Sequence, residues 1–230
     1  MKRILVLTIL ILTVLTHPVY ASDPPPLSTL VEALEARYRG IQDISASFSQ
    51  TTVIKGFPKP QRGAGRLLIR RPAGSSPQFR FEYRTPRQTI VSDGSTLWFY
   101  QPEAASVIIQ SLRGQQASGI SRAVAFIADL GSIAQDFHIN YASPARDAQG
   151  HVRIILTPKR TPLFKSLLLT LSKQLETAAD GHEFPIIAAV LTDQSGTTTS
   201  FQYRDITINQ GMTAGRFHFV PPPHTAVIRP

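Results

Sequence analysis

The spacing of apolar residues changes near residue 43, and the change predicts two kinds of element. From Leu27 to Gly40 apolar residues recur every three or four positions, which is typical of an amphipathic helix, and glycine is common at a helix end. Beyond this point the interval becomes two, which predicts strands. The alternating segments are 44–54, 65–70, 78–84, 88–92, 96–101, 106–112, 137–142, 151–158, 165–172, 185–193, 197–209 and 216–222. We expect about ten or eleven strands.

A second helical pattern interrupts the strands in the middle of the chain. Ser121 is a suitable first cap and Gly131 a suitable end. The apolar residues at helical spacing are Ile120, Val124, Ile127 and Leu130. A helix of about ten residues is marginal by itself, so we expect it to be held by docking.

The turns between the alternating segments predict a mainly β fold with helices. Asp93 and Gly94 form a strong hairpin signal between two of the segments. Strands at this spacing imply an antiparallel sheet that curls into a sandwich or a barrel. Segments 167–171 and 186–191 are apolar at nearly every position, which predicts that both faces of the sheet are covered. We expect a curled sheet whose concave face is capped by the two helices.

The start of the chain predicts export. Lys2 and Arg3 precede an apolar run that ends near Ala21, which is the pattern of a cleaved signal peptide, so we expect a leader over 1–21 and one domain over 22–230. The 24 basic residues include Lys2 and Arg3, so the domain has 22 basic and 15 acidic residues and a formal charge of +7. These charges are scattered, which disfavours nucleic acid as a partner. With no cysteine, the chain has no disulfide, thiolate metal site or acylated cysteine anchor.

The sequence contains no recognisable catalytic or metal-binding motif. No GxSxG, HExxH, EF-hand loop or P-loop is present, and the histidines lack metal-ligand spacing. His138 and His218 lie in alternating segments and are expected to be structural. The pair Gly63 and Gly65 precedes a strand, so a turn or bulge is expected there. We expect no enzyme activity, metal or cofactor, while a catalytic set assembled from dispersed residues stays an alternative.

Aromatic and aliphatic residues in the first half of the chain are candidates for an apolar binding surface. Phe79, Phe81 and Tyr83 alternate with charged residues and share one strand face. The further candidates are Leu67, Ile69, Trp98 and Tyr100. Each of them could equally fill an ordinary core. A curled sheet of about ten strands makes a cavity plausible because it encloses more room than its side chains readily fill.

The order of these motifs resembles the LolA family, the periplasmic carriers of outer-membrane lipoproteins. The resemblance rests on "FSQ" at 48–50, "GRLLIRRP" at 65–72, "FRFEY" at 79–83, "IVSDGSTLWFY" at 90–100, "FQYRDITIN" at 201–209 and "FHFVPPP" at 217–223. It implies an unclosed antiparallel β-barrel with a helical lid over a hydrophobic cavity. It also implies a monomer in the periplasm that receives acylated lipoproteins from an inner-membrane ABC transporter complex and passes them to an outer-membrane lipoprotein acceptor. The absence of cysteine fits the soluble carrier and not the anchored acceptor. Alternatives are a carrier of another lipid or glycolipid, a periplasmic sensor, or an enzyme.

The resemblance also assigns roles to individual residues. Arg71 and Pro72 match an arginine-proline pair implicated in holding the lid closed, and Phe79 lies where the family handles cargo and contacts the transporter. Phe81 stands where many relatives have tryptophan, and the link 73–77 is longer than usual, which puts the transporter-facing loop in doubt.

Arg71 also raises a structural question, because alternation places it on the same face as Leu67 and Ile69. A guanidinium has five donors, and the last carbonyls of a helix lack partners. We therefore expect Arg71 to latch the C-terminal end of the lid helix near Leu130, where the helix dipole also favours a cation. The alternative is an arginine at the rim that extends into water.

Overall fold

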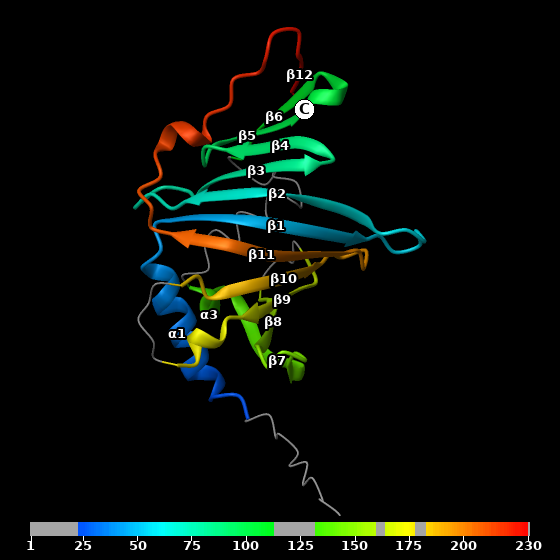
Figure 1. The fold of residues 1–230 in the computed structure, drawn as a ribbon. Helices are drawn as coiled ribbons and strands as arrows, with labels where there is room; N and C mark the ends of the chain where they lie inside the picture. The colour runs from blue at the N-terminus through cyan, green and yellow to red at the C-terminus, as the bar shows by residue number, and fades with distance from the viewer. Residues whose placement is uncertain (1–22, 113–131, 160–163, 178–182, 230) are drawn as a thin grey trace, which may run out of the picture.

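A computed structural model describes residues 23–112, 132–159, 164–177 and 183–229, and these form one long sheet (Figure 1). Its twelve strands are β1 Asp43–Val53, β2 Gln61–Arg70, β3 Gln78–Thr85, β4 Arg87–Ser92, β5 Thr96–Gln101, β6 Ser106–Ser111, β7 Phe137–Arg146, β8 Val152–Pro158, β9 Ser166–Leu171, β10 Ile186–Thr192, β11 Thr198–Ile208 and β12 Ala226–Ile228. The helices in the described ranges are α1 Leu27–Arg39 and α3 Ile133–Asp136, with the 3₁₀ helices η1 Pro102–Ala104, η2 Lys173–Leu175 and η3 Ala214–Phe217.

The strand order places β1 beside β11 at the centre of the sheet. The order is β12-β6-β5-β4-β3-β2-β1-β11-β10-β9-β8-β7, so the chain runs outward from β1 to β6 and later returns from β7 to β11, beside β1. Pairing is antiparallel except between β12 and β6. The edge strands β12 and β7 do not pair with each other among the described residues. The prediction of an unclosed, mainly antiparallel sheet is confirmed.

Helix α1 covers one face of this sheet because its own apolar residues lie on one side. The buried residues of the helix are Leu30, Val31, Leu34 and Tyr38. They belong to one core with the buried side chains of strands β1 to β5 and β7 to β11. Burying each such aliphatic side chain contributes about 1.5–3 kcal/mol, so the packing outweighs the weak intrinsic stability of a short helix. We call the sheet face that shares this core the inner face.

A second contact joins α1 to the far edge of the sheet. The backbone N–H of Ala134 in α3 donates to Glu35 Oε1 of α1 at 3.0 Å, and Ile133 is buried in the shared core. Lys159 Nζ in turn donates to the carbonyl oxygen of Ala134 at 2.8 Å. Helix α1 is therefore fixed to α3 and to the segment that follows β8. No helix in the described ranges is long and apolar enough to cross a membrane.

The hairpin predicted at Asp93 is present. The Asp93 N–H donates to the Thr96 carbonyl oxygen at 3.3 Å, and Gly94 has a φ of +95°, a conformation that favours glycine. Burial alone would raise the pKa of the Asp93 carboxyl, but hydrogen bonds from the N–H groups of Thr96 and Ser95 and from the Ser95 hydroxyl lower it overall, with help from the charge of His218. Asp93 therefore stabilises the turn in its ionised form.

One predicted strand is wrong. Segment 216–222 begins in η3 and continues without strand pairing, and the last strand is instead β12, at 226–228. The physical reason is the proline run 221–223, which supplies no backbone N–H for a sheet. His218 accordingly lies outside any strand.

Two predicted segments lie outside the described residues. They are the central helix, with Val124, Ile127 and Leu130, and the leader at 1–21.

Candidate functional site

Five aromatic side chains meet at the middle of the inner face. We call them the inner aromatic cluster: Phe48, Phe81, Tyr83, Phe201 and Tyr203. They come from β1, β3 and β11, strands that are far apart in sequence but close in the sheet. The Phe48 ring is central, with its centroid 4.9 Å from Tyr83, 5.3 Å from Phe81 and 6.0 Å from Phe201. Edge-to-face and tilted pairs at these distances add stability beyond the buried area.

Glycine in β2 allows the aromatic rings of β1 and β3 to meet. Gly65 lies between Phe48 and Tyr83 in the register, so the rings of both neighbours approach each other over a position without a side chain. A Cβ atom on Gly65 would lie 2.0 Å from the carbonyl oxygen of Glu82, which the backbone does not tolerate. The register of β2 and β3 shifts between Ala64 and Gly65, so the predicted bulge is confirmed.

The other aliphatic and aromatic candidates of β2 and β3 extend this surface. Leu67 pairs with Phe81 and Ile69 with Phe79, so all four side chains lie on the inner face. Each is buried in the shared core. The structure thus brings together five of the residues that the sequence singled out, which are Leu67, Ile69, Phe79, Phe81 and Tyr83.

The structure does not bring Trp98 and Tyr100 together with these residues. Trp98 pairs with Val91 on the opposite face of the sheet and belongs to a separate small core with Val91 and Val107. The C-terminal segment covers this outer face, with the Tyr100 and Phe219 ring centroids 5.3 Å apart. The reason is the alternation along β5, since Leu97 faces inward and its neighbour Trp98 must face outward.

Two tyrosines of the inner aromatic cluster carry hydroxyl groups in different situations. Tyr83 Oη donates to Gln50 Oε1 at 2.6 Å. Among the described residues, no hydrogen-bond partner lies within reach of Tyr203 Oη, although this residue is only 6% exposed. Burial raises the pKa of both phenols, so both hydroxyls are protonated at neutral pH.

The sequence analysis did not single out Phe48, Phe201 and Tyr203, although the alternation in "SASFSQ" and "SFQYR" could have placed them on one face.

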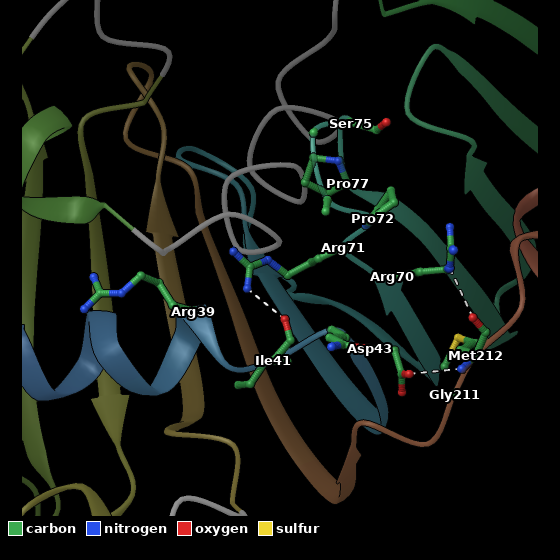
Figure 2. A pocket seen from close by; sticks show the side chains of 13 residues that line it. Arg39, Ile41, Asp43, Arg70, Arg71, Pro72, Ser75, Pro77, Gly211 and Met212 are labelled. Carbon is green, nitrogen blue, oxygen red and sulfur yellow. Dashed lines mark hydrogen bonds between the residues drawn. The ribbon is translucent and has the colours of Figure 1, made fainter.

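A cavity of about 780 Å³ opens at the end of α1, next to the inner core (Figure 2). Its walls come from the end of α1, the start of β1, the link between β2 and β3, and the segment after β11. Among the residues that the structure describes, three arginines line it, Arg39, Arg70 and Arg71, with Asp43 as the single acid. Asp43 is buried, and its two carboxylate oxygens accept hydrogen bonds from the N–H groups of Gln210 and Met212 at 2.9 and 3.0 Å. The cavity is therefore polar and cationic.

Arg71 joins the end of β2 to the end of α1. Its Nη1 donates to the carbonyl oxygens of Tyr38 and Ile41, the second at 2.9 Å, and Figure 2 shows the contact with Ile41. The guanidinium also lies 4.8 Å from the centroid of the Tyr38 ring, a cation–π contact. The Tyr38 carbonyl lies in the last turn of α1, where partners within the helix run out, and the Ile41 carbonyl lies two residues beyond the helix end. The contact expected near Leu130 lies outside the described residues. The link from Ala73 to Pro77 forms part of the cavity wall beside Pro72.

These features define a class of proteins that combine a long unclosed antiparallel sheet with a helix-covered apolar inner face. A family model described as "Outer membrane lipoprotein carrier protein LolA" matches residues 39–220. The chain therefore belongs to the LolA family.

Several curated proteins are similar to this chain along most of its length. One from Chromobacterium violaceum, named outer-membrane lipoprotein carrier protein, is 29% identical, with 89% of each chain covered. Another of the same name from Hahella chejuensis is 30% identical over 86% of this chain and 88% of its own. Among solved structures, a LolA superfamily protein from Nitrosomonas europaea gives a TM-score of 0.44 at 12% identity, covering 84% of this chain and 97% of the other.

Proposed function

We propose that this protein is a periplasmic carrier that binds the acyl chains of lipoproteins against the inner face of its sheet. The observation that supports the proposal most strongly is the continuous, buried apolar cluster that the inner aromatic cluster forms with its aliphatic neighbours, in a member of the LolA family. The names of the curated relatives support a carrier role. The proposal assigns no catalytic role to the cationic cavity at the end of α1.

The physical need for such a surface follows from the hydrophobic effect. Each buried methylene contributes about 0.8 kcal/mol, so a chain of about sixteen carbons is held in a membrane by roughly 12 kcal/mol. A carrier must replace most of this burial with its own apolar side chains. Because α1 shares the core with the inner face, the entry of a chain requires that some of these contacts separate. Energy for extraction comes from a partner, which we propose is an inner-membrane ABC transporter complex, and release is to an outer-membrane lipoprotein acceptor.

Arg71 has a restraining role in this proposal. It bonds the end of α1 to β2 at the edge of the inner face, so it opposes separation of the helix from the sheet. We propose that the same side chain also latches the lid helix near Leu130 and thereby controls release. Arg71→Leu should bind cargo but alter its handover to the acceptor; unchanged handover would contradict the latch.

The cavity wall formed by Ala73 to Pro77 has a proposed role in docking. This link lies next to Pro72 and Arg71 and is largely exposed. We propose that it forms part of the surface that meets the transporter. Photocrosslinkers placed at Ser75 should capture transporter subunits, whereas capture only from the β1–β2 turn near Phe57 would contradict this placement.

The experiment that tests the proposed function is native co-purification. The protein isolated from the periplasm of its own cells should carry acylated polypeptides, identified by mass spectrometry of the intact complex and of its lipids. Depletion of the protein should leave lipoproteins in the inner membrane. Bound glycolipid without acylated protein would indicate a different cargo on the same fold. An empty protein, together with unchanged lipoprotein sorting after depletion, would refute the proposal.

A further inference from the structure

Tyr203 places a hydroxyl in the mainly apolar inner aromatic cluster. The residue lies in β11, pairs with Phe48 in β1, and stacks on Phe201 with ring centroids 6.2 Å apart and an interplanar angle of 4°. Its hydroxyl is buried, and no acceptor or donor among the described residues lies within hydrogen-bond distance of it. A buried hydroxyl without a partner lowers stability by about 1–3 kcal/mol, so such groups are rare in folded proteins.

The neighbouring side chains explain why the hydroxyl has no protein partner. The side chains of Phe48 and Phe201 have no polar atoms, and the hydroxyl of Tyr83 is already bonded to Gln50. The Tyr38 phenol is near enough to raise the pKa of Tyr203, but it does not lie within hydrogen-bond distance of the Tyr203 hydroxyl. A trapped water requires about two to four polar partners, and the Phe48 and Phe201 rings beside Tyr203 supply none. Phenylalanine would fill the same space in β11 without this cost. The free hydroxyl is therefore better explained by a partner that arrives from outside the protein.

We infer that Tyr203 Oη is the hydrogen-bond donor to the ester or amide carbonyl oxygen at the polar end of a bound acyl chain. The inference rests on the proposed function and deepens it, because it fixes where the polar end of the chain lies. A hydrocarbon tail offers no acceptor, whereas the acyl group of a lipid offers a carbonyl oxygen at its first carbon. Phe48, Phe81 and Phe201 then contact the methylene groups that follow. Burial keeps the phenol protonated, as a donor must be.

The hydroxyl gives the surface a means of selecting acyl groups over other apolar molecules. Apolar contacts alone discriminate weakly, since every methylene contributes the same amount. A hydrogen bond formed only with the correct ligand adds direction and fixes the depth of the chain. The loss of such a bond is expected to weaken binding about two- to tenfold.

A pair of ligands and a pair of variants test this assignment with the purified protein. Displacement of a fluorescent apolar dye compares methyl laurate with pentadecane, which has the same number of non-hydrogen atoms but no carbonyl. Tyr203→Phe should weaken binding of the ester about two- to tenfold and leave binding of the alkane unchanged. Tyr100→Phe removes the same group on the outer face and should change neither affinity. Equal effects of Tyr203→Phe on both ligands, or no effect on either, would overturn the assignment.

Two further readouts keep the test decisive. Ligand-free Tyr203→Phe should unfold at a temperature no lower than that of the wild type, because no internal hydrogen bond is lost. In the wild type, the infrared carbonyl band of bound methyl laurate should lie at lower frequency than in hexane, and an unshifted band would overturn the assignment without any variant. If the wild type binds neither ligand, the proposed function itself fails. If it binds both but Tyr203→Phe does not distinguish them, only the role of Tyr203 fails.

Discussion

Arg71→Leu tests how strongly one arginine fixes α1 to the sheet. The substitution removes the hydrogen bonds to the carbonyl oxygens of Tyr38 and Ile41 and the contact with the Tyr38 ring. A hydrogen bond from a charged donor contributes about 1.5–3 kcal/mol, and an exposed cation–π contact about 0.5–1 kcal/mol. Arg71 is only partly buried, and leucine restores some of the packing. We therefore expect a net loss of about 2 kcal/mol, or about 4–8 °C in Tm for a domain of this size.

The assay combines a global and a local measurement. Urea unfolding can be followed by the fluorescence of Trp98, which is the only tryptophan and lies on the outer face, away from the substitution. Hydrogen exchange over residues 27–41 reports the local stability of α1. We expect Arg71→Leu to unfold at a lower urea concentration than the wild type. We also expect its amide exchange to increase more over residues 27–41 than in the rest of the chain.

The matched control is Arg66→Leu, which changes an exposed arginine in β2, the strand that Arg71 follows; the Arg66 guanidinium bonds the Ser45 hydroxyl. Its stability should stay within about 0.5 kcal/mol of the wild type. If Arg71→Leu and Arg66→Leu unfold at the same urea concentration and exchange over 27–41 is unchanged, the restraining role of Arg71 is refuted.

Two further predictions concern the sheet and its turns. Gly65→Ala should destabilise the protein by at least about 2 kcal/mol in urea unfolding, because the added Cβ meets the backbone of Glu82. Gly63→Ala should destabilise it less, because the Cβ added there meets the Tyr83 ring, at 3.1 Å. Equal effects of the two substitutions would contradict the role of Gly65. Hydrogen bonds, led by that of the Ser195 hydroxyl, lower the pKa of Asp193, and Asp93 is shifted in the same direction. The two carboxylates should therefore stabilise the protein above about pH 4, and this stabilisation should be lost as the pH falls through their lowered pKa values in the folded state. Asp193→Ala should flatten the acid limb of a curve of unfolding free energy against pH. An unchanged acid limb would contradict this prediction.

Local patterns in the sequence predicted α1 and strands β1 to β11, most of them from their period and β9 and β10 from short, almost wholly apolar runs; α3 was not predicted. The turn at Asp93 was also predictable, because Gly94 adopts the positive φ that glycine favours, and so was the bulge beside Gly65, because a glycine within a strand often marks a bulge. The structure of segment 216–222 was not predictable in this way, because "RFHF" alternates like a strand while the prolines that follow it cannot pair.

The composition of the site was harder to predict because it depends on contacts that are distant in sequence. Phe48 and Tyr203 are opposite each other only because β11 returns beside β1. In β5 both faces are apolar, so alternation could not decide whether Trp98 faced the inner core; the register with β4 and the covering C-terminal segment decide it. Likewise, the sequence did not indicate that Arg71 contacts the end of α1; the expected contact with the lid helix near Leu130 stays a prediction, because that helix lies outside the described residues.

The most direct test of the central claim places a photocrosslinking amino acid on each face of the sheet. Benzoylphenylalanine at Phe81 lies in the inner aromatic cluster, and the same residue at Tyr100 lies on the outer face. After irradiation in cells, the proposal predicts adducts with acylated polypeptides from position 81 and none from position 100. Adducts of equal yield from both faces, or from position 100 alone, would contradict the claim that the inner face carries the acyl chains.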